Sequence, residues 1–181
     1  FSVSRLNFID FNTIGNLEVL KGSGSSLYGG DAIGGVVSLK SIRPDDLLEP
    51  GDNFSFEFPA DYSGANDSFN GAIKFALREG DFEGIGVISK GSGNELNRKT
   101  DDKFMDDYES ESKGLYTKLI KKIGETTEIG LTYENYQKDS ETVTTPENLT
   151  GNYQSAIHEG DSERKRISLD FDYASPEDTN F

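Results

Sequence analysis

The stretch from Leu17 to Leu39 reads LEVLKGSGSSLYGGDAIGGVVSL, and it decides the fold class of the chain. Six glycines fall within fourteen positions of it, with short apolar runs between and around them. Glycine at this density marks tight turns and close approach of one backbone to another. The stretch therefore predicts short β-segments that turn sharply. A phosphate-binding loop fits less well, because the stretch has neither a Gly-Lys-Ser/Thr ending nor a GxGxxG spacing.

Downstream of Gly51 the pattern changes to an alternation of apolar and polar residues with a period of two. Successive side chains of a strand point to opposite faces, so each such run predicts a strand with one apolar face. A further strand is expected from Phe82 to Lys90, although Gly84 and Gly86 weaken its pattern. The residues expected on one continuous apolar face are Phe54, Phe56, Phe58, Ile73, Phe75, Leu77, Ile129, Leu131, Leu169 and Phe171.

The connections between these runs alternate between short and long. Glu79–Asp81 and Gly124–Thr126 are short, whereas residues 91–112 form a long acidic connection and residues 137–162 a long polar one. Short turns at one end and long loops at the other are typical of outer-membrane β-barrels. A soluble β-domain gives the same strand alternation, and on pattern alone both remain open.

Composition narrows the function classes. A net charge of −15 argues against nucleic acid as a partner, because phosphate binding needs a basic surface. Twelve Phe and eight Tyr argue for an ordered protein, and the absence of Cys excludes disulfides and thiolate metal sites. No apolar run approaches the ~18 residues of a transmembrane helix, which fits a soluble protein and a β-barrel equally. The chain begins abruptly at Phe1 without a visible signal peptide, and we interpret it as an internal piece of a longer protein.

The glycine-rich stretch closely resembles the signature near the end of the plug domain in TonB-dependent outer-membrane receptors. In that family a strand of the type IEVLRGP leads into SxLYG and then AIGGVV. This chain has Lys21 where Arg is usual and Ser23 where Pro is common. The matching positions, interpreted as structural, are Lys21, Gly22, Leu27, Tyr28, Gly29, Ala32, Gly34 and Gly35.

The resemblance implies an all-β fold, part of a transmembrane antiparallel β-barrel preceded by the C-terminal part of an N-terminal plug domain. Residues 1–43 would belong to the plug, 44–52 to the connector, and 53–181 to about the first six barrel strands. The long loops are expected near 91–112 and 137–162.

Softer resemblances point to the heme and hemoglobin receptor branch. They lie at Arg43–Gly51, Asn94–Asn97, Leu131–Tyr136 and Gly160–Ile167. This branch implies uptake of heme, alone or from hemoglobin-type proteins, with heme as transported substrate and not as a catalytic cofactor. It further implies a bacterial outer-membrane location in contact with lipid, and a TonB energy-coupling protein whose contact segment lies before Phe1. The alternatives are a siderophore or cobalamin receptor, and a soluble or surface β-domain that binds a protein or glycan.

The sequence gives no reason to assign a ligand-binding or metal-binding role to the following polar residues. His158 is the only histidine, and we interpret it as a solvated loop residue, because the family's heme-ligating histidines fall outside this chain. Arg164, Lys165 and Arg166 are interpreted as lumen or rim charges in preference to lipopolysaccharide contacts. A solvated loop is preferred to a calcium site for the acidic residues Asp101, Asp102, Asp106, Asp107, Glu109 and Glu111. No metal ligands and no nucleophile–base constellation are evident, so an enzyme is not expected.

Overall fold

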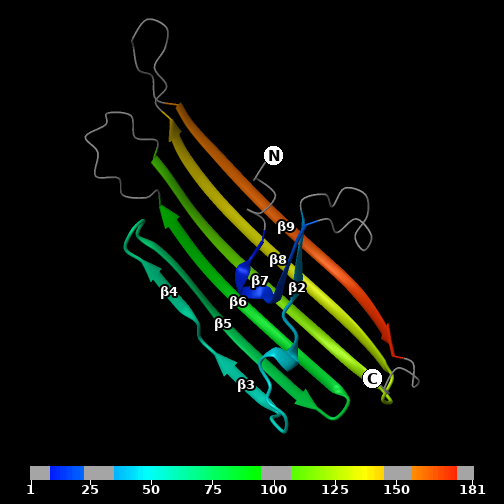
Figure 1. The fold of residues 1–181 in the computed structure, drawn as a ribbon. Coiled ribbons are helices and arrows are strands. Elements are labelled where there is room, and N and C mark those ends of the chain that lie inside the picture. Colours follow the sequence, from blue (N-terminus) through cyan, green and yellow to red (C-terminus); the bar gives the residue numbers. More distant parts are fainter. Residues whose placement is uncertain (1–8, 23–34, 95–106, 145–155, 175–181) are drawn as a thin grey trace, which may run out of the picture.

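The computed structural model describes residues 9–22, 35–94, 107–144 and 156–174, which form β-strands and two short 3-10 helices (Figure 1). The predicted all-β class is confirmed. No helix in these residues is long and apolar enough to cross a membrane. In chain order the elements are η2 (Phe11–Thr13), β1 (Ile14–Lys21), β2 (Gly35–Ser41), η3 (Pro44–Asp46), β3 (Phe54–Glu57), β4 (Ala60–Ser63), β5 (Ser68–Glu79), β6 (Phe82–Asn94), β7 (Asp107–Ile123), β8 (Thr127–Thr144) and β9 (Ala156–Tyr173).

Strands β3 to β9 form one antiparallel sheet, which we call the sheet wall. Its order is β3-β5-β6-β7-β8-β9, and β4 also pairs with β5 beyond the end of β3. β3 and β4 are therefore two pieces of one edge strand, interrupted at Phe58–Pro59, where proline cannot donate a ladder hydrogen bond. The seven strands occupy six positions across the sheet.

The two faces of the sheet wall differ as the alternation predicted. Phe75 lies opposite Gly86, which lies opposite Thr117 and then Tyr133, and in the adjacent row Leu119 lies opposite Leu131. Residues two positions apart on one strand share a face, as Leu131 and Tyr133 do. Phe75 and Leu131 therefore lie on the same outer face. Nine of the ten residues predicted for this face are exposed large hydrophobics, and the tenth, Ile129, is half-buried.

On β8 and β9 the apolar outer face covers only the end that carries the short turn, whereas on β4 and β5 it continues to Tyr62 and Phe69. On β9 the outward residues are apolar from Tyr173 to Ile167, and the next two outward residues are Lys165 and Glu163. On β8 the change falls between Tyr133 and Asn135, which pairs with Lys165. On these two strands a band of hydrophobic residues thus gives way to a charged region.

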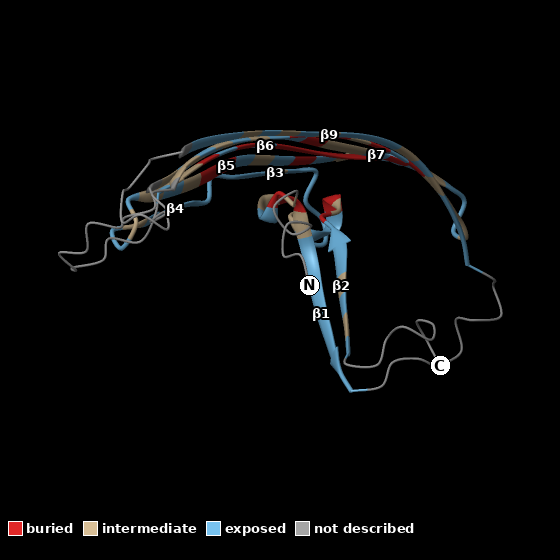
Figure 2. Ribbon diagram, turned by 90° about the horizontal axis from the view of Figure 1, so that it is seen from above, coloured by how far each residue is buried: buried red, intermediate tan, exposed pale blue. Residues whose placement is uncertain are grey.

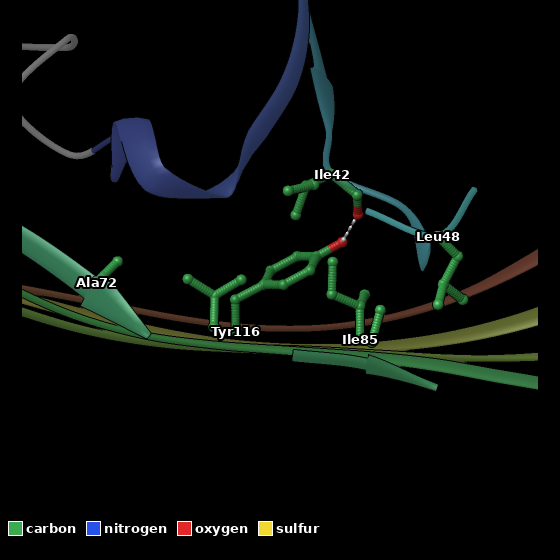
Figure 3. Close-up of a cluster of buried hydrophobic side chains, with 7 residues drawn as sticks. Ile42, Leu48, Ala72, Ile85 and Tyr116 are labelled. Carbon is green, nitrogen blue, oxygen red and sulfur yellow. Dashed lines mark hydrogen bonds between the residues drawn. The ribbon is translucent and has the colours of Figure 1, made fainter. Parts of the chain in front are cut away.

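The inner face carries the core. Ile85 and Tyr116 from the sheet pack beneath Ile42 and Leu48 of the segment that follows β2 (Figure 3), and Val87 belongs to the same cluster. Burial of an aliphatic side chain of this size contributes about 1.5–3 kcal/mol, so this cluster fixes the segment to the wall. Among the described residues, N-terminal segments therefore cover the inner face, and the apolar band of the outer face stays exposed.

β1 and β2 form a hairpin of their own that projects from the concave side of the curved sheet wall (Figure 2). Its register places Leu17 opposite Leu39 and Val19 opposite Val37, with an irregularity between Ile14 and Asn16. Nearly all of its residues are exposed. Within the described part of the chain, the hairpin meets the sheet at its base.

Both short turns were predicted, and each contains a glycine with a positive φ, at Gly80 and at Gly124. The long loops, by contrast, were predicted too long. β6 continues to Asn94, β8 continues to Thr144, and residues predicted as loop are paired, such as Glu111 with Asp139. Both faces are polar there, so no alternation signals a strand, yet the ladder of backbone hydrogen bonds needs no particular side chain.

Candidate functional site

Only some residues of the plug-like motif in the glycine-rich stretch lie in the part of the chain that the structure describes. Lys21 ends β1, Gly22 has a φ of 103° and Gly35 a φ of 141°. A Cβ at Gly35 would lie 2.5 Å from the backbone oxygen of Leu20, so only glycine fits there. The remaining motif residues, Leu27, Tyr28, Gly29, Ala32 and Gly34, lie outside the described residues.

The segment after β2 is tied to the sheet wall by polar contacts. The hydroxyl of Tyr116 donates a hydrogen bond to the backbone oxygen of Ile42 at 3.0 Å (Figure 3). The guanidinium of Arg43 pairs with Glu128 of β8 at 2.6 Å. Partial burial works to lower the pKa of Arg43, but the hydrogen bond and charge of Glu128 outweigh it, so that the pKa lies above its ordinary value.

A second ion pair attaches the connector to the sheet wall, two residues after Arg43 in the chain. Asp45 of η3 pairs with Arg78 at the end of β5. Nε of Arg78 also donates to Oε1 of Glu83 at 2.7 Å, and Nζ of Lys122 reaches the same oxygen at 2.7 Å. The side chain of Glu83 is only 1% exposed, and a buried carboxylate is tolerated when cations and hydrogen bonds surround it. This network joins the connector to three strands.

The residues before β1 make a separate contact with the inner face, on β6. The carboxylate of Asp10, a buried residue, accepts hydrogen bonds from the hydroxyl of Ser89 and from Asn12. A Cβ at Gly114 would lie 2.3 Å from Oδ2 of Asp10, so glycine leaves the room for this approach. The hairpin is thus bracketed by one anchor before it and two after it.

Arg164 and Arg166 of β9 lie on the inner face and share one carboxylate, that of Glu134 on β8. Glu134 is 3% exposed, and Arg166 lies directly opposite it across the strands. The lumen interpretation of these arginines agrees with this position, whereas Lys165 lies on the outer face and pairs with Glu163. Sequence reasoning missed Glu134, although the period-two spacing of the arginines hinted at a shared face.

A cleft of about 140 Å³ lies between this cluster and the base of the hairpin, and we call it the junction cleft. Ile14 and Lys40 line it from the hairpin, and Glu134, Arg164 and Arg166 line it from the sheet wall. Nε of Arg164 is enclosed and has no hydrogen-bond partner among the described residues. The junction cleft is therefore a small, cationic space where the N-terminal part meets the sheet.

Two interpretations of single residues need correction. His158 was assigned to a loop, but it lies on β9 opposite Thr142 and is exposed. Asp107, Glu109 and Glu111 lie on β7 and not in a loop, because the strand extends past the apolar band. Asp101, Asp102 and Asp106 lie outside the described residues. Within the described part of the chain no group of His, Asp and Glu side chains has metal-binding geometry.

The segments that suggested the heme branch fall on different elements. Arg43–Gly51 contains η3 and the ties described above, Leu131–Tyr136 lies on β8, and Gly160–Ile167 lies on β9. Asn94 ends β6, and residues 95–97 lie outside the described part.

Comparison with known proteins places these features in a family. Residues 1–36 match the family described as TonB-dependent Receptor Plug Domain. The chain is 32% identical over 99 residues to a hemin receptor of Yersinia pestis, covering 48% of this chain and 14% of that protein. It is 38% identical over 60 residues to heme/hemopexin utilization protein C of Haemophilus influenzae, covering 33% of this chain and 8% of that protein.

A third relative is transferrin-binding protein A of Haemophilus influenzae, 29% identical over 85 residues, which cover 47% of this chain and 9% of that protein. The matched regions thus span roughly a tenth of each of these curated relatives. The plug match, the antiparallel sheet behind it and the names of these relatives agree with one another. Residues 1–36 therefore carry the plug domain of the TonB-dependent receptors, and the chain is similar to receptors named for hemin, heme/hemopexin and transferrin.

Proposed function

We propose that the whole protein is an outer-membrane receptor that actively takes up heme, either free or from a hemoglobin-type protein. The observation that carries the proposal is the match of residues 1–36 to the plug domain, joined to a sheet whose outer face is an apolar band. Relatives named as a hemin receptor and a heme/hemopexin utilization protein support heme as the substrate. The chemistry is transport and not catalysis.

The apolar band supports a place in the membrane. Lipid-facing strands expose alternating hydrophobic residues, and transmembrane barrels are bounded by aromatic residues near the interface. Phe82, Phe171 and Tyr173 lie exposed at the short-turn end of the outer face, where such a boundary is expected. The charged outer residues beyond Ile167 would then stand outside the membrane, since charges on a lipid-facing surface are costly.

We also propose the division of the chain. Residues 1–43 belong to the plug, 44–52 to the connector, and 53–181 to the first part of the barrel. The bracketing anchors support this division, because the hairpin projects from the concave side while η3 and its neighbours are fixed to the inner face. An energy-coupling protein of the inner membrane is the proposed partner that moves the plug.

Growth of a receptor-deletion strain that carries the full-length gene tests the substrate. With heme or hemoglobin as the only iron source, the gene is expected to restore growth, and a coupling-protein deletion is expected to abolish it. Ferric siderophores, cobalamin and iron-loaded transferrin serve as parallel arms. Restoration by a siderophore or by transferrin, without restoration by heme, would refute the heme proposal and identify the alternative receptor class.

A further inference from the structure

The cluster at the junction cleft has an excess of positive charge. Arg164 and Arg166 together bring two guanidiniums to the single carboxylate of Glu134. Lys40 also lines the cleft, although it pairs with Glu18 on the hairpin. The excess is unusual in a chain whose net charge is −15.

The hydrogen bonding of the cluster is incomplete. Nε of Arg164 is shielded from solvent and has no acceptor among the described residues. A buried donor without a partner costs about 1–3 kcal/mol, so a second carboxylate that draws the Arg164 side chain away from Glu134 would relieve this cost. The guanidinium fork is well suited to a carboxylate, which it can hold through two parallel hydrogen bonds.

The size of the space limits the ligand group. A volume of about 140 Å³ admits an aliphatic carboxylate and does not admit a whole porphyrin or iron chelate. The cleft lies where the base of the hairpin meets β8 and β9, so in the proposed receptor it lies at the boundary between the plug and the barrel wall.

We propose that the junction cleft binds a carboxylate group of the transported ligand through Arg164 and Arg166, with Glu134 as the internal group that the ligand competes with. The proposal rests on the proposed transport function and adds the chemical class of the recognised group. Two sources carry such a group, the propionates of a porphyrin and the free carboxylates of an iron chelator such as citrate.

The test compares heme with its dimethyl ester, in which both propionates are blocked, on the full-length receptor in detergent, followed by Soret absorbance. Wild type is expected to bind heme about tenfold more tightly than the ester, the scale of one lost charge-assisted contact. Glu134→Gln, which removes the competing carboxylate, is expected to increase this preference.

The triple variant Glu134→Gln/Arg164→Gln/Arg166→Gln keeps the size and polarity of the cluster without leaving a buried charge, and it is expected to abolish the preference. Lys165→Gln is the matched control, because it removes a neighbouring cation from the opposite face, and it is expected to leave the preference unchanged. A preference that survives in the triple variant, or a wild type that binds both porphyrins equally, overturns the proposal.

If wild type binds neither porphyrin, the heme function fails and the cleft is tested with ferric citrate instead. A loss of about tenfold in citrate affinity in the triple variant then supports the carboxylate site, again on the scale of one charge-assisted contact. Equal affinity in wild type and triple variant, or no citrate binding, overturns it. Failure of the heme function and failure of the carboxylate site therefore give different results.

Discussion

Single residues decide how the N-terminal part is attached to the sheet wall. Tyr116 is 1% exposed, and its ring packs in the core while its hydroxyl reaches the backbone of Ile42. Phenylalanine at this position would keep the apolar contact and leave a carbonyl without its donor. The attachment of the connector therefore depends on one polar atom in an apolar setting.

Tyr116→Phe is expected to destabilise the full-length protein by about 1 kcal/mol, the typical cost of one buried hydrogen bond. Thermal unfolding in detergent, followed by circular dichroism, measures the loss as a lower Tm. Tyr133→Phe is the matched control, since Tyr133 lies half-buried on the outer face of the neighbouring strand. An equal decrease in both variants would mean that the hydroxyl of Tyr116 has no special role.

His158→Ala is expected to leave heme binding nearly intact. His158 is exposed on β9, opposite Thr142, and a tuned metal ligand is usually held and oriented by neighbouring groups. Heme titration of wild type and variant, followed by the Soret band, gives the two affinities. A loss greater than tenfold would identify His158 as a ligand and contradict its interpretation as a solvated residue.

At the scale of the strand, one element has two environments along its length. The outward residues of β8 change from Leu131 and Tyr133 to Gln137 and Asp139 without any break in the pairing with β9. In the charged region Glu111, Asp139 and Asp161 lie directly opposite one another, an arrangement that destabilises adjacent strands unless solvent screens it. This part of each strand therefore requires water on its outer side.

Leu131→Lys is expected to impair assembly of the full-length protein in the outer membrane, because a lysine on the lipid face costs about 2–4 kcal/mol near the midplane. Gln137→Lys, on the same face of the same strand but beyond the band, is expected to assemble normally. Heat-modifiable migration on gels measures the folded fraction of each. If both variants assemble equally well, the apolar band does not face lipid.

At the scale of the whole molecule, the apolar outer face and the free edge of β9 have no cover among the described residues. Ile167 and Leu169 are each 74% exposed, far more than a soluble monomer usually leaves on a continuous surface. An unpaired strand edge adds backbone donors and acceptors that invite association. In the proposed receptor, lipid would cover this apolar face and neighbouring strands would pair with this edge.

The chain of residues 1–181, produced alone, is expected to aggregate in the absence of detergent. Light scattering and size-exclusion chromatography measure its association, and thermal unfolding measures its cooperativity. A monodisperse, detergent-free monomer with one sharp transition would contradict this expectation and favour the soluble β-domain.

The local features of this protein were predictable from its sequence. The period-two alternation identified the outer face because side-chain direction on a strand follows from backbone geometry alone. The glycines of the short turns and of the hairpin were recognisable because only glycine adopts their backbone conformations without strain. The resemblance of the stretch Leu17–Leu39 to the plug signature indicated the family before any contact was known.

The tertiary structure decided what depends on residues distant in the chain. Arg43 and Glu128 are 85 positions apart, and Tyr116 meets Ile42 across 74 positions, so no local pattern announces either contact. The ends of β6, β8 and β9 were likewise hidden, because polar residues on both faces give no alternation while backbone hydrogen bonds continue. The junction cleft exists only because the curvature of the sheet wall and the register of β8 with β9 bring two arginines, one glutamate and the base of the hairpin together.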